Sequence, residues 1–352
     1  MLVAGEDGFP PNHEPTTSNQ QRVPDSHLRD MSTDHYTALR SGDRSALARA
    51  ITLVESTREE DAEAARELVL RCIPDAGGSR RIGITGIPGA GKSTLIDAIG
   101  ILLVEQGHRV AVLAIDPSSS RSGGSILGDK TRMERLSQHP SAFIRPSPTG
   151  GTLGGVGRRT RETLVLCEAA GYDRVLIETV GIGQSELAVD RMTDLNLLLM
   201  IGGAGDELQG IKRGIMEAAD IIVLTKTDGD NTERNKRSAG DLRQAIQLLP
   251  ARDHGGRPEV LLCSAAENKG MSEILSALDK LSAKLEEQGH TAVRRRDQDR
   301  WWMRATIEER LVTGFYNDPR VRSALPELEQ AVSDGTRSPF DAADELLRLA
   351  RD

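Results

Sequence analysis

The sequence predicts an α/β fold: a three-layer, doubly wound and mostly parallel sheet with helical N- and C-terminal extensions. Short continuous apolar runs alternate with helical patterns from Arg81 onward, as is typical of parallel strands buried on both faces. A glycine-rich motif follows the first run at the point where a strand of such a sheet turns into a helix. The expected strands are 81–85, 110–115, 142–145, 175–177, 195–201, 221–224 and 260–262.

The segments around this sheet differ in composition and periodicity. The N-terminal segment is rich in Pro, Asn, Asp, Ser and Gln without apolar periodicity, which predicts a disordered extension. The next segment has apolar residues at helical spacing, with breaks at 41–43 and 56–59 that predict short helices. The predicted divisions are 1–35 (disordered extension), 36–78 (helical segment), 79–285 (sheet domain) and 286–352 (helical arm).

Both tryptophans of the chain, Trp301 and Trp302, lie together in the C-terminal helical pattern. They could pack on the chain's own sheet domain or form a subunit interface, and the sequence favours neither arrangement.

Composition limits the classes of partner. The formal charge of −8, from 45 basic and 53 acidic residues, argues against general affinity for nucleic acid or for an anionic membrane. No apolar run approaches the roughly 20 residues of a membrane span, and no secretory signal pattern opens the chain. We expect a cytoplasmic protein, or one of a matrix-like compartment if the chain is a eukaryotic precursor. Three widely separated cysteines and seven scattered histidines predict reduced, mostly buried thiols and no dedicated metal site.

Residues 86–94 read Gly-Ile-Pro-Gly-Ala-Gly-Lys-Ser-Thr, a complete phosphate-binding loop of the pattern G-x-x-x-x-G-K-[ST]. The glycines allow backbone N–H groups to surround phosphate oxygens, and the following helix adds its positive end. Lys92 would reach the β- and γ-phosphates, and Ser93 would give its hydroxyl to Mg²⁺. We therefore expect binding of a nucleoside triphosphate. The expected binding residues of the loop are Gly86, Pro88, Gly89, Ala90, Gly91, Lys92, Ser93 and Thr94.

Two acidic residues follow expected strands, at the end where doubly wound sheets bind ligands. Asp116 could hold Mg²⁺ or orient the attacking water, and the alternative is a turn or helix cap. Glu178 opens a Glu-Thr-Val-Gly segment in which Gly181 can offer its N–H to the γ-phosphate. Ile182 then stands where Ras-type switches have a water-orienting glutamine, so we expect slow intrinsic hydrolysis that a partner or a rearrangement completes.

The identity of the base depends on two later segments. Residues 225–228 (TKTD) resemble the N-K-x-D guanine motif, in which the aspartate accepts hydrogen bonds from guanine N1–H and the 2-amino group. Thr225 stands where the motif has asparagine, which removes one orienting amide. Residues 263–265 follow the last strand, where a backbone N–H would meet guanine O6. The sequence thus favours guanine over adenine, with Lys226, Asp228, Ser264 and Ala265 at the base.

Five segments together resemble a known family: GIPGAGKST (86–94), AIDPSSSRSGGSILGDKTRM (114–133), PSPTGGTLGG (146–155), ETVGIGQSE (178–186) and GAGDELQGIKRGIMEAADI (203–221). The chain is similar to the MeaB/ArgK family of P-loop GTPases of the SIMIBI class, whose human member is the methylmalonic aciduria type A protein. The resemblance implies a P-loop NTPase fold, hydrolysis of GTP to GDP and dependence on Mg²⁺.

The resemblance further implies a homodimeric chaperone of an adenosylcobalamin-dependent acyl-CoA mutase, typically methylmalonyl-CoA mutase. In this family GTP hydrolysis gates transfer of cobalamin from an adenosyltransferase and protects or reactivates the mutase. By position, Lys92, Asp116, Asp129 and Glu178 would be catalytic, and Ser93, Asp116, Asp129 and Glu178 would hold the metal. A third switch would relay the nucleotide state to the mutase. The C-terminal helices would form the dimerisation arm, which favours an interface for Trp301 and Trp302. The expected switch residues are Asp206, Glu207, Gln209 and Lys212.

Two other functions stay open at this point. Members of the family have been called arginine/ornithine transport kinases, although the sequence offers no obvious lid or base for an acceptor. Relatives in the same class deliver nickel, which would call for a His/Cys cluster that this sequence lacks.

Overall fold

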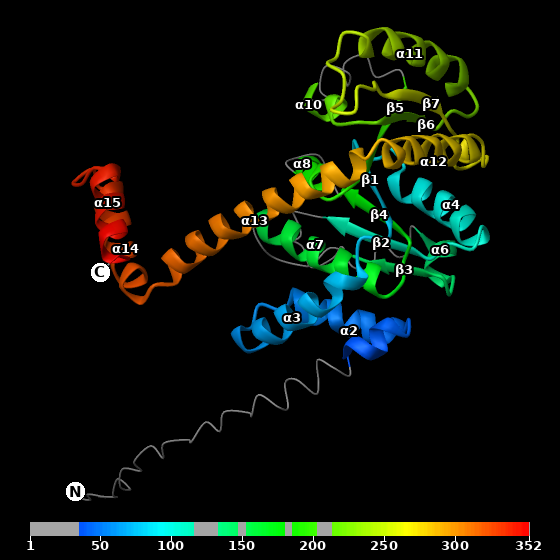
Figure 1. Ribbon diagram of the computed structural model, residues 1–352. Helices are drawn as coiled ribbons and strands as arrows, with labels where there is room; N and C mark the ends of the chain where they lie inside the picture. The colour runs from blue at the N-terminus through cyan, green and yellow to red at the C-terminus, as the bar shows by residue number, and fades with distance from the viewer. Residues whose placement is uncertain (1–34, 116–132, 147–152, 180–184, 203–212, 352) are drawn as a thin grey trace, which may run out of the picture.

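The computed structural model describes residues 35–115, 133–146, 153–179, 185–202 and 213–351 (Figure 1). Within them, one sheet of seven parallel strands runs in the order β3-β2-β4-β1-β5-β6-β7. The strands are β1 (Arg80–Gly86), β2 (Val110–Ile115), β3 (Ala142–Arg145), β4 (Arg174–Thr179), β5 (Leu195–Ile201), β6 (Ile221–Thr225) and β7 (Glu259–Leu262). Each of the seven predicted strands is confirmed to within two residues at either end.

Helices cover both faces of the sheet, as predicted for a three-layer fold. One face packs against α4 (Lys92–Glu105), α6 (Glu134–Gln138) and α12 (Met271–Glu287). The other face packs against α7 (Leu153–Ala169), α8 (Ser185–Asp190), α10 (Arg213–Glu217) and α11 (Asn231–Ile246). Most of the strands are buried on both sides, which explains why they appear in the sequence as short apolar runs.

The predicted N-terminal helices are α2 (Arg44–Glu55) and α3 (Glu59–Cys72), and they pack on the outside of α7 (Figure 1). Asp43 caps α2 by accepting from the backbone N–H groups of Ser45 and Ala46, at 2.7 and 3.2 Å. A short 3-10 turn, η1 (Ile73–Asp75), follows α3 and leads to β1. All three cysteines of the chain are buried and free of disulfides, as the sequence predicts.

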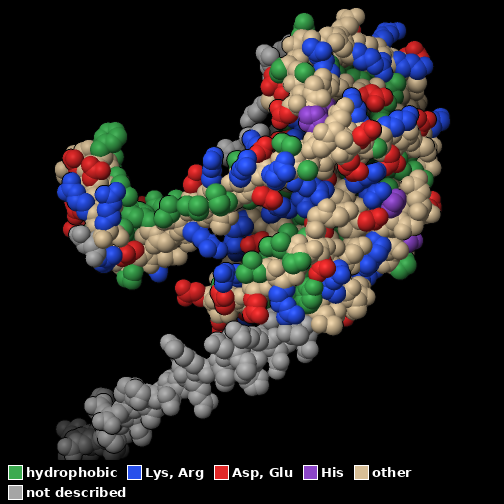
Figure 2. All heavy atoms as spheres, in the orientation of Figure 1, with side chains coloured by type: hydrophobic (Ala, Val, Ile, Leu, Met, Phe, Trp, Pro, Cys, Tyr) green, Lys and Arg blue, Asp and Glu red, His purple; other side chains and the backbone are tan. Residues whose placement is uncertain are grey.

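The C-terminal part is a projecting helical arm (Figure 1). It consists of α13 (His290–Asn317), which leaves the sheet domain, and of α14 (Pro319–Ser333) and α15 (Pro339–Leu349), which pack on each other at its far end. Figure 2 shows a row of hydrophobic side chains along α13 where it leaves the domain. The exposed apolar residues there are Met303, Ile307, Leu311 and Val312. None of the helices in the described ranges is long and apolar enough to cross a membrane.

The two tryptophans of α13 have different environments. Trp302 is buried, its Nε1 donates to the carbonyl oxygen of Arg191 at 2.7 Å, and its ring lies against Gly157 of α7. The neighbouring Trp301 is 37% exposed and stands edge-on to Trp302. Of the two arrangements that the sequence left open, Trp302 therefore packs on the chain's own sheet domain.

Candidate nucleotide-binding site

The phosphate loop connects the last residue of β1, Gly86, to the first residue of α4, Lys92. Gly86 has φ 145°, and a Cβ there would lie 2.3 Å from the carbonyl oxygen of Leu199 in β5. Gly89 and Gly91 also have positive φ, at 77° and 85°, which side chains disfavour. The loop therefore has the strand–loop–helix geometry in which backbone N–H groups and the start of α4 face a phosphate.

The side chain of Lys92 is held by backbone carbonyl groups of the phosphate loop. Its Nζ donates to the carbonyl oxygens of Gly86 at 2.8 Å and Ile87 at 3.2 Å, and the side chain is buried. These bonds place the ammonium group beside the loop at the carboxyl end of β1, where an incoming phosphate would offer stronger, charged acceptors.

Ser93 and Glu178 come together although 85 residues separate them in the sequence. Strand β4 lies beside β1 with Ile84 opposite Glu178, and this register brings the carboxylate to the start of α4. The Ser93 hydroxyl donates to Glu178 Oε1 at 3.0 Å, and both side chains are buried. Hydroxyl and carboxylate oxygens are the hard donors that Mg²⁺ prefers, so this pair fits the metal of a nucleoside triphosphate.

The base end of the site is built from the two predicted segments, which the fold places side by side. The backbone N–H of Thr227 donates to the carbonyl oxygen of Cys263 at 2.9 Å. The Ser264 hydroxyl donates to Asp228 Oδ2 at 2.5 Å, so this hydroxyl orients the carboxylate. Lys226, between them, has φ 56°, in the left-handed region. Ala265 follows Ser264 at the same edge and is partly buried.

Two residues hold the segment 225–228 through hydrogen bonds that the sequence did not indicate. Thr225, seen only as a departure from asparagine, donates its hydroxyl to the carbonyl oxygen of Ala90 in the phosphate loop at 2.7 Å. Asn235 of α11 donates to the carbonyl oxygen of Thr225 and to the hydroxyl of Thr227. A sequence signal for Asn235 exists, because it lies on the helical face that also carries the buried Ala239 and Leu242.

Several predicted site residues lie outside the described residues, so their roles stay predictions. They are Asp116, Asp129, Gly181, Asp206, Glu207, Gln209 and Lys212. The structure describes β2 as far as Ile115, the residue before Asp116. Ile115 pairs with Thr179, the residue after Glu178.

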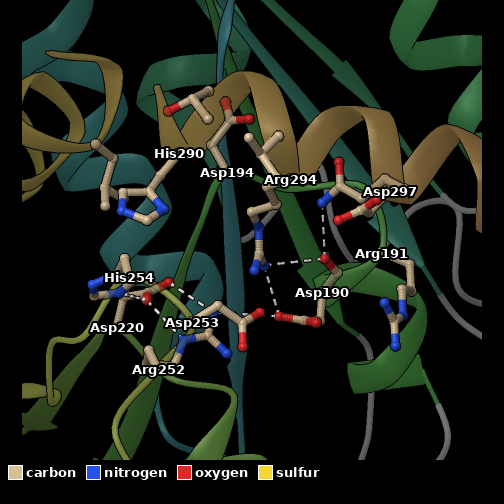
Figure 3. Close-up of a pocket in the computed structure, with 14 residues that line it drawn as sticks. Asp190, Arg191, Asp194, Asp220, Arg252, Asp253, His254, His290, Arg294 and Asp297 are labelled. Atoms are coloured by element: carbon tan, nitrogen blue, oxygen red, sulfur yellow. Dashed lines mark hydrogen bonds and ion pairs between the residues drawn. The ribbon is translucent and has the colours of Figure 1, made fainter. Parts of the chain in front are cut away.

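A cavity of about 310 Å³ lies at the opposite end of the sheet, near the amino ends of β5 and β6 (Figure 3). Its charged groups bind one another: Asp220 accepts from Arg252 Nε at 3.0 Å and lies 3.1 Å from His254 Nε2. Burial alone would raise the pKa of Asp220, but the hydrogen bond to His254 and the nearby charges of Arg252 and Arg294 hold this pKa below its usual value. The charged residues that line this cavity therefore form a structural ion-pair network, which is separate from the phosphate loop.

Side chains of α13 attach the arm to the end of α8 beside this cavity. Arg294 donates to the Asp190 carboxylate at 2.8 Å (Figure 3) and to the carbonyl oxygen of Thr193 at 2.9 Å. Gln298 donates to the carbonyl oxygens of Asp190 at 3.0 Å and Thr193 at 2.8 Å. The carbonyl group of Asp190, the last residue of α8, lacks a partner within its own helix, and here α13 supplies one. The arm thus contacts the helix that follows the Glu178 segment in the chain.

Comparison with known proteins gives consistent matches across most of the chain. A family model described as methylmalonyl-CoA mutase-associated GTPase MeaB matches residues 47–320. A protein of Mycobacterium tuberculosis named as a GTPase is 51% identical over 325 residues, covering 92% of this chain and 97% of the relative. The mitochondrial methylmalonic aciduria type A homolog of Mus musculus is 46% identical over 323 residues, covering 89% of this chain and 78% of the relative. The crystal structure of a LAO/AO transport system kinase is similar with a TM-score of 0.71 and 35% identity, covering 94% of this chain and all of that one.

Proposed function

This chain belongs to the MeaB family of methylmalonyl-CoA mutase-associated GTPases, and we propose that its GTP hydrolysis gates cobalamin loading and protection of an adenosylcobalamin-dependent acyl-CoA mutase. Methylmalonyl-CoA mutase is the client that we infer, with a cobalamin adenosyltransferase as the source of the cofactor. The observation that carries the proposal is the family match over 47–320, because it spans the phosphate loop, the end of β4 and the base segments together. The mouse relative, named for methylmalonic aciduria, supports the same client.

In the proposed mechanism the phosphate loop binds the triphosphate of GTP. Lys92 exchanges its bonds to the carbonyl oxygens of Gly86 and Ile87 for the β- and γ-phosphate oxygens. Ser93 and Glu178 are the described residues that would hold Mg²⁺, which neutralises phosphate charge when bound. Asp116 and Asp129 complete the expected metal set, and Gly181 would bind the γ-phosphate through its N–H.

Guanine is selected at Asp228 in this proposal. The carboxylate, oriented by the Ser264 hydroxyl, accepts hydrogen bonds from guanine N1–H and the 2-amino group. Adenine has neither donor, so it would leave a desolvated carboxylate unpaired. Lys226 would pack its stem on the nucleotide, and the N–H of Ala265 would meet guanine O6.

We propose that residues 203–212 transmit the nucleotide state to the mutase. The residues that would contact the mutase are Asp206, Glu207, Gln209 and Lys212. Intrinsic hydrolysis is slow, because Ile182 stands where a water-orienting glutamine would act. The client then regulates the lifetime of the GTP-bound state. We propose that this GTPase and its client act in the cytoplasm.

We further propose that the arm forms a homodimer. Met303, Ile307 and Leu311 recur at intervals of four residues and so lie along one side of α13, and each is at least half exposed (Figure 2). An exposed apolar row of this kind is typical of a protein interface. A second copy of the chain would bury it.

Capture of methylmalonyl-CoA mutase tests the proposed client. Purified protein, loaded with GDP or with a non-hydrolysable GTP analogue, is mixed with the mutase and analysed by size-exclusion chromatography. We expect a complex whose stability depends on the nucleotide, and the dependence should disappear in Lys92→Ala. No complex in either nucleotide state would contradict the proposal.

A kinase is the second candidate, because the similar solved structure is named a transport system kinase. Labelled γ-phosphate separates the two functions. We expect the label only as inorganic phosphate, whereas label on a small molecule or a protein would favour the kinase.

A further inference from the structure

Asn235 of α11 reaches the base loop from outside the TKTD motif. It is 1% exposed, and its Nδ2 donates both hydrogens, to the carbonyl oxygen of Thr225 at 2.9 Å and to the Thr227 hydroxyl at 2.8 Å. These two acceptors belong to the residues directly before and after Lys226. One carboxamide therefore spans the turn at Lys226.

The turn that Asn235 spans is unfavourable without such support. Lys226 has φ 56°, a region that residues with a Cβ adopt rarely and only where the surroundings enforce it. Two further bonds fix the same turn, from the Thr225 hydroxyl to Ala90 and from the Thr227 N–H to Cys263. Because Asp228 follows two residues after Lys226, the conformation of this turn sets where its carboxylate points.

The surroundings of Asn235 indicate that its side chain serves as a hydrogen-bond donor and not as an acceptor. Among the described residues its Oδ1 has no hydrogen-bond partner, and it lies against Gly202 at the end of β5. A Cβ at Gly202 would come within 1.9 Å of this oxygen. A buried acceptor without a partner is destabilising, so packing alone would be better served by an apolar side chain.

We propose that Asn235 is a positioning residue for guanine specificity: its carboxamide holds residues 225–228 in the conformation in which Asp228 meets guanine N1–H and the 2-amino group. The inference rests on the proposed guanine site at Asp228. It also accounts for Thr225 in place of the usual asparagine. The Thr225 hydroxyl ties the loop to the phosphate loop, and the orienting amide comes from α11.

Base discrimination in Asn235→Ala tests the proposal. Dissociation constants are measured for GDP and for IDP, whose base lacks the 2-amino group. Loss of the two hydrogen bonds from Asn235 should weaken GDP binding about tenfold, and it should weaken IDP binding less. The preference for GDP over IDP should therefore fall several-fold.

Leu242→Ala is the matched control, since Leu242 is buried on the same helix and packs in the apolar core. It should lower the melting temperature and leave the preference for GDP over IDP unchanged. Thr227→Val is the second variant, for use if Asn235→Ala does not fold. It removes the hydroxyl that accepts from Asn235 with little change in shape, and it should lower the preference for GDP over IDP about threefold.

An unchanged preference in folded Asn235→Ala, or in Thr227→Val where Asn235→Ala does not fold, would overturn the proposal. Asp228→Asn separates this failure from failure of the guanine site itself. If Asp228→Asn gains binding of xanthosine nucleotides while the preference stays unchanged in Asn235→Ala, only the role of Asn235 is wrong. If Asp228→Asn gains none, the guanine site at Asp228 is wrong and the role of Asn235 falls with it.

Discussion

The adjacent tryptophans of α13 provide a sharp test of how the arm is attached. Trp302 is 7% exposed and bonds Arg191 through Nε1, and a Cβ at Gly157 would lie 2.7 Å from its ring. Trp302→Ala therefore removes a large packed side chain together with a hydrogen bond to the end of α8. Substitutions of this kind cost about 3–5 kcal/mol in the free energy of unfolding.

A loss of this size should lower the melting temperature by about 10 °C, from the usual shift per kcal/mol for domains of 150–250 residues. Trp302→Phe keeps an aromatic ring but loses the N–H donor, so we expect a smaller loss of about 1–2 kcal/mol. Trp301→Ala is the neighbouring control. Trp301 is 37% exposed and has Arg191 5.8 Å from its ring centroid, an interaction worth about 1 kcal/mol or less.

Calorimetry and urea unfolding at one protein concentration measure all three variants. The expected order of destabilisation is Trp302→Ala, then Trp302→Phe, then Trp301→Ala. Equal destabilisation by Trp301→Ala and Trp302→Ala would refute the claim that the buried Trp302 contributes more to the attachment of the arm than the exposed Trp301.

The base site, the phosphate loop, the arm and the buried Asp220 each provide a single-residue test. Asp228→Asn should weaken GTP binding and improve binding of xanthosine triphosphate, because the carboxamide can donate to the 2-oxo group; an unchanged base preference in competition binding would contradict the guanine assignment. Lys92→Ala should abolish GTP hydrolysis with the circular dichroism spectrum unchanged, and residual wild-type activity would exclude this loop as the site. Leu311→Asp should convert a dimer to a monomer in light scattering, and a persisting dimer would place the interface elsewhere. Asp220, whose pKa is lowered in the folded protein, contributes stability above its unfolded pKa of about 3.9 and loses it as the pH falls through the folded value. Asp220→Asn should therefore be less stable than wild type at pH 7, with a gap that narrows in acid; a gap independent of pH would refute the ion-pair account.

The strands were predictable because of their environment. A parallel strand covered on both faces has apolar residues at most of its positions, and this pattern is visible in the sequence without knowledge of the neighbouring strands. The phosphate loop was predictable for a similar reason, since its glycines and Lys92 act within one strand–loop–helix unit.

Contacts that depend on register were not predictable in the same way. Thr225 looked like a loss relative to the N-K-x-D motif, and only the position of Ala90 beside the end of β6 shows what its hydroxyl binds. Asn235 belongs to a helix outside both motifs, and its role depends on how α11 packs over β6. The environment of Trp302 depends likewise on the angle at which α13 crosses α7 and α8.

The rate of GTP hydrolysis with and without the mutase tests the central claim most directly. A slow GTPase that serves as a switch for its client should hydrolyse GTP several-fold faster when saturating methylmalonyl-CoA mutase is present. Lys92→Ala, as the control, should show no hydrolysis in either condition. An identical rate with and without the mutase, measured with a wild-type protein that binds GTP normally, would contradict the proposed coupling.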